Sequence, residues 1–76
     1  MRYGTIDTTN DDHNNYHQTT ILFSDIVAVT IITLKRLGLS KKLCMHIHLS
    51  GGTKLICKPM SVEIVTKFNE NIWEEK

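Results

Sequence analysis

Two runs of alternating apolar and polar residues meet at a Ser-Gly-Gly turn (residues 50–52), and this pattern predicts a β-hairpin over residues 43–58. A two-residue turn made by the glycines alone would put two lysines on the apolar face. A three-residue turn, with Gly52 left-handed as in a G1 bulge, pairs Leu49 with Thr53 instead. A one-residue slip moves every side chain to the other face, so we expect burial to select the second register. One face then carries Met45, Ile47, Leu49, Leu55 and Cys57, and the other carries Cys44, His46, His48, Lys54, Ile56 and Lys58.

The residues on either side of this hairpin predict one more strand and one helix. Residues 25–35 are rich in β-branched side chains and apolar on both faces, which favours a buried strand. Pro59 lacks an amide donor and ends the last strand, and Ser61 is a natural N-cap for a helix from Val62 to about Trp73. The apolar stripe of this helix consists of Ile64, Val65, Phe68 and Ile72. We therefore expect an α+β fold, a small antiparallel β-sheet in a meander with one C-terminal α-helix packed on one face. Three strands are expected, or four if residues 2–8 add an edge strand.

The first twenty residues differ in composition from the rest. Residues 1–20 are rich in Thr, Asn, Asp and His, and we expect a flexible polar N-terminal arm followed by a single sheet-helix domain over residues 21–76. A chain of 76 residues buries only about 60% of the surface that its unfolded form exposes, so its stability margin is thin. Burial of more apolar surface in an oligomer is one common way to raise that stability. One helix covers only one face of the sheet, so the second face of the strand at 25–35 needs another cover. We expect self-association as a homodimer through Ile26, Ala28, Ile32 and Leu34.

The net charge of +1 hides an uneven distribution, because residues 27–61 hold six basic side chains and no carboxylate. Together with two histidines, these are our candidates for binding an anionic partner: Lys35, Arg36, Lys41, Lys42, His46, His48, Lys54 and Lys58. The basic face carries no aromatic residue for base stacking and the net charge is small, so we expect another protein with an acidic surface. Nucleic-acid or nucleotide binding through the basic hairpin face is the alternative.

Metal binding and catalysis are weakly supported. His46 and His48 share a strand face with Cys44, but a fourth ligand and a second-shell carboxylate are lacking nearby, and we expect no metal and no cofactor. His13 and His17 are four apart, yet the neighbouring asparagines disfavour a helix. The chain shows no nucleophile elbow, phosphate loop or paired carboxylates, so we expect a protein that is not an enzyme. Cys44 beside His46 has the residue types of a nucleophile and base, but neighbours on one strand rarely meet at attacking geometry.

Cysteine usage and hydropathy give an expectation for location. The two cysteines form neither a disulfide framework nor a CxxC pair, and they fall on opposite faces of the predicted hairpin. The first twenty residues lack the apolar core of a signal peptide, and the most apolar run, residues 21–34, is too short and too polar to span a bilayer. We expect a cytoplasmic protein with no membrane partner.

The order of a strand, a hairpin with Leu-Ser-Gly-Gly-Thr (residues 49–53) and a Ser-capped helix resembles several small bacterial sheet-helix modules. The brevity of the chain and its Ile/Lys/Asn/Thr-rich usage are similar to small accessory proteins of phages and mobile elements. Such proteins often inhibit or redirect host machinery by stoichiometric binding. The resemblance implies a small regulatory protein that acts by binding.

Overall fold

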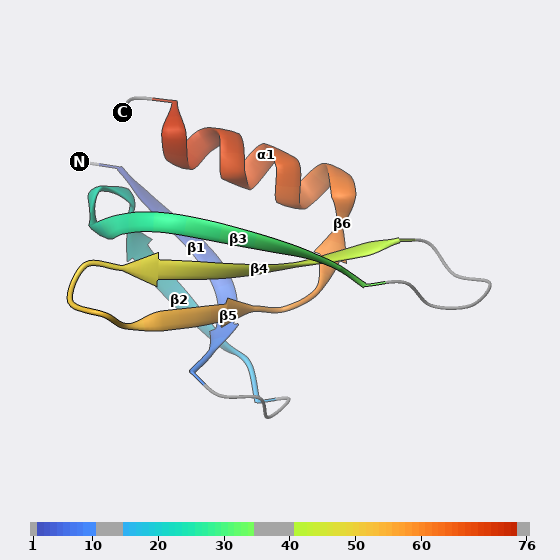
Figure 1. The fold of residues 1–76 in the computed structure, drawn as a ribbon, viewed down its shortest axis with the longest axis horizontal. Helices are drawn as coiled ribbons and strands as arrows, with labels where there is room; N and C mark the ends of the chain where they lie inside the picture. The colour runs from blue at the N-terminus through green and yellow to red at the C-terminus, as the bar shows by residue number, and fades with distance from the viewer. Residues whose placement is uncertain (1, 11–14, 35–40, 75–76) are drawn as a thin grey trace.

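In the computed structural model, residues 2–10, 15–34 and 41–74 are described, and they form one antiparallel sheet and one helix (Figure 1). The elements in chain order are β1 (Tyr3–Thr9), β2 (His17–Leu22), the 3-10 helix η1 (Phe23–Asp25), β3 (Ile26–Leu34), β4 (Lys42–Leu49), β5 (Lys54–Cys57), β6 (Met60–Ser61) and α1 (Val62–Trp73). The strand order across the sheet is β2-β1-β5-β4-β3, and the short β6 pairs with β4. The predicted α+β class, the antiparallel sheet and the C-terminal helix are confirmed.

The β4–β5 hairpin has the predicted register. The Leu49 amide donates to the Thr53 carbonyl at 2.8 Å, and the Gly52 amide donates to the Leu49 carbonyl at 3.2 Å. Ile47 is opposite Leu55, so their side chains share one face. Gly51 and Gly52 have φ angles of +92° and +93°, which side-chain-bearing residues rarely adopt. The three-residue turn therefore depends on both glycines.

The expected number of strands was too low, because the segment we expected to form a polar arm contributes β1 and β2. These strands pair with each other, and β1 also pairs with β5 through Thr8 and Thr9. Threonine is polar in composition but favours strands, and the Thr8 and Thr19 hydroxyls lie 2.7 Å apart across the β1–β2 pair. The sheet is therefore not a simple meander, since its first strand lies between its second and its fifth.

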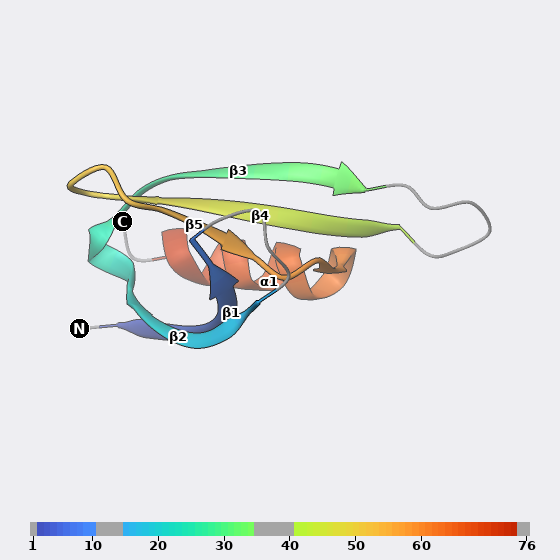
Figure 2. The same cartoon turned by 90° about the horizontal axis from the view of Figure 1, so that it is seen from below.

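The sheet curls from β3 to β2, and α1 lies over its concave side (Figure 2). The helix begins at Val62 and ends at Trp73 as predicted, and the Ser61 hydroxyl accepts a hydrogen bond from the Ile64 amide at 3.4 Å. The core between helix and sheet consists of Ile6, Ile21, Phe23, Ile26, Leu43, Met45, Ile47, Leu55, Cys57, Val65 and Ile72.

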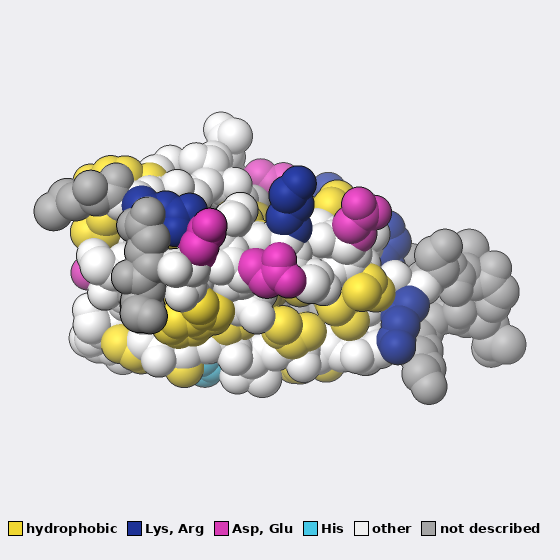
Figure 3. All heavy atoms as spheres, turned by 90° about the horizontal axis from the view of Figure 1, so that it is seen from above, with side chains coloured by type: hydrophobic (Ala, Val, Ile, Leu, Met, Phe, Trp, Pro, Cys, Tyr) yellow, Lys and Arg dark blue, Asp and Glu magenta, His cyan; other side chains and the backbone are white. Residues whose placement is uncertain are grey.

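One member of the predicted helix stripe is turned outward. Val65 and Ile72 are buried and Phe68 packs against the core, but the Ile64 side chain is 55% exposed. Successive helix residues turn by about 100°, so with Val65 centred on the sheet Ile64 points to the flank. Figure 3 looks down on α1, with charged side chains on its upper surface and apolar side chains along the border where β3 lies.

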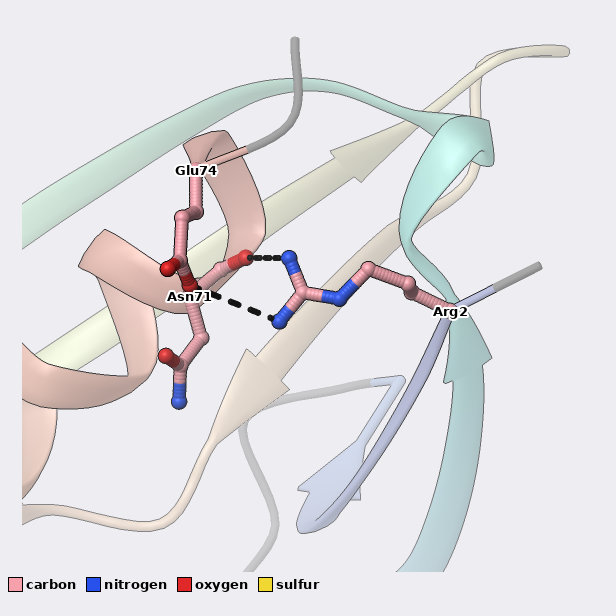
Figure 4. A network of polar contacts seen from close by, with 3 residues as sticks. All are labelled: Arg2, Asn71 and Glu74. Atoms are coloured by element: carbon pink, nitrogen blue, oxygen red, sulfur yellow. Dashed lines mark hydrogen bonds and ion pairs between the residues drawn. The ribbon is translucent and has the colours of Figure 1, made fainter.

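Arg2 connects the start of β1 to the end of α1 (Figure 4). Its guanidinium donates to the Asn71 carbonyl at 3.0 Å and lies 3.7 Å from a Glu74 carboxylate oxygen. The same group lies 5.5 Å from the centroid of the Phe23 ring. An exposed ion pair of this kind contributes little by itself, so we regard the contact as a surface link over the core.

Helix α1 has twelve residues, and in the described part of the chain no helix is long and apolar enough to cross a membrane.

Candidate binding surface

The face of β3, β4 and β5 that points away from α1, here called the outer face, carries most of the candidate residues. Strand pairing places Thr30 opposite His46, and His46 opposite Ile56. Alternation along the strands then assigns the following residues to the outer face: Ala28, Thr30, Ile32 and Leu34 from β3, Lys42, Cys44, His46 and His48 from β4, and Lys54 and Ile56 from β5.

The four residues predicted for self-association do not share one face. Ala28, Ile32 and Leu34 lie on the outer face, whereas Ile26 is only 1% exposed and belongs to the core. The reason is an irregularity in register between Ile26 and Ala28, which adds one residue and reverses the alternation. Ile26 is therefore corrected from a surface residue to a core residue.

The histidines lie side by side on the outer face, as the sequence predicts. His46 is half-buried between its cross-strand neighbours, and His48 Nε2 lies 3.2 Å from the Thr30 hydroxyl. Among residues 2–10, 15–34 and 41–74, no group of three or more His, Cys, Asp or Glu side chains could hold a metal ion. These half-buried imidazoles can offer a partner hydrogen bonds on the side of the sheet away from α1.

The two cysteines are free and buried, and they contact each other through the backbone. The Cys44 thiol donates to the Cys57 carbonyl at 3.3 Å. Burial raises the pKa of Cys44, and burial together with the nearby Cys44 raises the pKa of Cys57 to about 12. Both thiols are therefore protonated near neutral pH, which disfavours Cys44 as a nucleophile next to His46.

The candidate cations do not form one cluster. Lys41 and Lys42 lie at one end of β4, whereas Lys54 is opposite His48 at the other end, about 20 Å away at the usual strand rise. Lys35 and Arg36 lie outside the described residues. Lys41, Lys42 and Lys54, here called the lysine rim, therefore lie at opposite ends of a centre that has no Lys, Arg, Asp or Glu. This centre, here called the neutral centre, consists of Ile32, Cys44, His46 and Ile56.

Lys58 has an acidic neighbour that the sequence did not indicate. Its amide donates to the Asp7 carbonyl at 3.0 Å, which extends the β1–β5 pairing by one residue. Residues directly opposite each other in a sheet share a face, so the Asp7 side chain lies next to Lys58. This end of β5 is less positive than we expected. Only the long-range pairing of residue 7 with residue 58 could have indicated it.

A pocket of about 510 Å³ opens where β1 and β2 approach β5. It is lined by Thr8, Thr9, Asn10, Asn15, His17, Thr19 and Leu55. The Thr8 and Thr19 hydroxyls contact each other, and the Thr19 hydroxyl donates to the His17 carbonyl at 3.1 Å. Sequence reasoning missed these residues because it assigned them to an arm. The signal available was the matching alternation of Ile6 and Thr8 with Thr19 and Ile21.

Comparisons of this chain with protein-family models, with curated proteins and with solved structures found no match.

Proposed function

We propose that this protein is a non-enzymatic binding module that acts by stoichiometric contact with an acidic protein surface, through the outer face of its sheet. The observation that supports this most is the arrangement of a neutral centre within a lysine rim. β3, β4 and β5 contain no Asp or Glu, and the helix covers the opposite face. Protein interfaces commonly have such an apolar centre and polar rim.

A protein partner is favoured over nucleic acid by the spacing and the chemistry of the face. Lys42 and Lys54 are separated by about 20 Å along the sheet, with uncharged residues between them. A nucleic-acid surface needs a denser track of cations, and single-stranded binders also use aromatic side chains for stacking. β3, β4 and β5 contain no Phe, Tyr or Trp. In our proposal the rim lysines accelerate encounter with the acidic partner, and the accessible side chains between them, Ile32 and His46, provide the contact area.

Three further features belong to the same proposal. The protein self-associates as a homodimer, which adds buried area to a chain of 76 residues. The buried free thiols of Cys44 and Cys57 support a reducing, cytoplasmic setting. The expectation that the partner belongs to host machinery inhibited by a phage or mobile-element protein rests on composition alone and stays a prediction.

Charge reversal at the rim tests the proposal, with polyglutamate as the probe of an acidic surface. Lys42→Glu and Lys54→Glu each change an exposed residue of the outer face. Lys67→Glu makes the same change on the exposed side of α1 and is the matched control. We expect each rim variant to bind labelled polyglutamate about three- to tenfold more weakly by fluorescence anisotropy, and the control to stay within about twofold of the wild type. All three should keep their stability within about 0.5 kcal/mol, because the changed residues lie outside the core.

A DNA duplex of equal charge, measured in parallel at low and high salt, gives the competing outcome. Tighter binding of the duplex, with the steep salt dependence of counterion release, would favour the nucleic-acid alternative and overturn the choice of a protein partner. Binding of neither probe, or equal loss in Lys54→Glu and Lys67→Glu, would overturn the anionic partner.

A further inference from the structure

The two edge strands of the sheet, β3 and β2, differ in how well they are protected against pairing with another chain. β3 is the last strand at one end, and in the part of the chain that the structure describes no strand pairs with its other side. Its nine residues contain no charge and no proline, two of the devices that usually protect an edge. β2, at the opposite end, has only six residues, starts with two polar side chains and curls away (Figure 2).

The register shows which backbone groups of β3 point out of the sheet. The Leu49 amide donates to the Thr53 carbonyl and the Leu49 carbonyl accepts from the Gly52 amide, so both backbone groups of Leu49 point to the β5 side. The backbone groups of every second residue of β4 then point toward β5, and those of the residues between point toward β3. The β3 residues bonded to β4 are then the ones opposite His48, His46, Cys44 and Lys42. The amides and carbonyls of Val29, Ile31 and Thr33 point outward, away from β4.

We infer that β3 pairs antiparallel with β3 of a second copy of this chain, about a two-fold axis at Ile31. Hydrogen bonds between the two copies can form only where outward-pointing amides and carbonyls of one copy lie opposite those of the other. The allowed registers are therefore those that place odd-numbered residues of one β3 opposite odd-numbered residues of the other. Regular pairing is limited by the irregularity before Ala28 and by the last strand residue, Leu34. Centring on Ile31 pairs residues 28–34 in full, whereas centring on Thr30 or Ile32 shortens the regular pairing by two residues.

The side chains fit this register. Val29 exchanges backbone bonds with the partner's Thr33, and Ile31 with the partner's Ile31. On the outer face Ile32 lies opposite the partner's Thr30, and Leu34 lies opposite the partner's Ala28, so each large side chain meets a smaller one. No charged residue enters the contact. Ile31 and Ile32, which are 41% and 40% exposed in the single chain, become covered only on the side that faces the partner strand.

The dimer formed in this way is closed, because each copy uses its only β3 edge. The two-fold axis of an antiparallel pair is perpendicular to the sheet, so both helices lie on one side and both outer faces form one continuous surface. This inference rests on the self-association proposed above and names its interface. It leaves the outer face free for the acidic partner.

Two substitutions in the same strand test the edge. Ile32→Lys places a charge within the paired stretch, and Val27→Lys places the same charge outside it, at a side chain that is 61% exposed. Sedimentation equilibrium of the wild type should give twice the chain mass of 8.7 kDa at micromolar concentration. We expect Ile32→Lys to raise the dissociation constant at least about tenfold and Val27→Lys to change it less than about twofold.

Single cysteine substitutions in β3 test the register by disulfide cross-linking between the two copies. This test does not depend on weakening the dimer. In the proposed dimer residue 31 faces its own copy at about 5.5 Å between Cα atoms, within the range of a disulfide. Residue 33 lies about 13 Å from its copy, because it faces residue 29. Under mild oxidation Ile31→Cys should form a covalent dimer on a non-reducing gel, and Thr33→Cys and the wild type should not.

The outcomes separate this inference from the proposal beneath it. A wild-type monomer at micromolar concentration would overturn self-association itself. A wild-type dimer that Ile32→Lys and Val27→Lys weaken equally, or that cross-links at residue 33 and not at residue 31, would overturn the β3 interface alone. If circular dichroism shows that Ile32→Lys is unfolded, the cross-linking result decides.

Discussion

Gly4 lies where β1 passes the aromatic pair of the core, and adding one methyl group there is a direct test of the fold. A Cβ at Gly4 would lie 2.5 and 2.7 Å from the Phe23 ring and 3.0 Å from Phe68 Cζ. These two rings meet edge to face with centroids 5.9 Å apart, and any shift of Phe23 disturbs Phe68 on α1. Overpacking of this kind costs about 1–3 kcal/mol, against about 0.5–1 kcal/mol gained by alanine over glycine in a strand. We expect Gly4→Ala to destabilise the protein by about 1–2 kcal/mol.

The assay is urea unfolding followed by circular dichroism, with Phe23→Leu as the second arm of a double-mutant cycle. Leucine lacks the ring atoms Cε1 and Cζ that the new methyl group would meet. In the Phe23→Leu background, Gly4→Ala should therefore cost less than about 0.5 kcal/mol, which gives a coupling free energy of about 1 kcal/mol. If the m-value, the slope of the free energy of unfolding against urea concentration, is the same in the variants and the wild type, the loss of stability comes from the folded state.

Gly52→Ala is the matched control. Nothing lies within 4 Å of a Cβ there, but the φ angle of +93° strains any side-chain-bearing residue. Its cost of about 1 kcal/mol should be the same with Phe23 or with Leu at position 23, since strain in the turn is independent of the aromatic pair. If Gly4→Ala is neutral or stabilising in the wild type, β1 does not pack on Phe23, and the flexible arm that we expected for residues 1–20 is the better description.

Two further predictions concern the two faces of the sheet and the buried thiol. Phe68→Ala should destabilise by about 3 kcal/mol, as for a core aromatic, and His46→Ala by less than about 1 kcal/mol; equal shifts in melting temperature would contradict the face assignment. The folded-state pKa of Cys57 is about 12, above its ordinary value of 9.0, so above pH 9.0 the unfolded chain ionises while the folded chain does not. Below pH 9.0 this thiol should not affect stability, and above pH 9.0 the free energy of unfolding should fall by about 1.4 kcal/mol per pH unit. The measurement is urea unfolding at several pH values between about 8 and 10. If the free energy of unfolding depends on pH in the same way in Cys57→Ala and in the wild type, this prediction is wrong.

The elements that sequence alone determined depend on neighbours in the chain. The helix boundaries follow from Ser61, whose hydroxyl needs only the amide three residues ahead, and from the helical spacing of Val65, Phe68 and Ile72. The hairpin register follows from two glycines with positive φ and from the alternation on either side of them. The histidines of the candidate surface were placed together for the same reason, because residues two apart on one strand share a face.

Tertiary structure decided what depends on residues far apart in the chain. Thr8 and Thr9 look like part of a polar arm, yet they are buried because β1 pairs with β5 about fifty positions later. The irregularity before Ala28 moved Ile26 into the core, and the pairing that extends to Lys58 brought Asp7 next to it. Periodicity records which residues share a face within one strand. It does not predict which other strand pairs with a given strand. That pairing depends on how much apolar surface the whole chain buries when the sheet curls over α1.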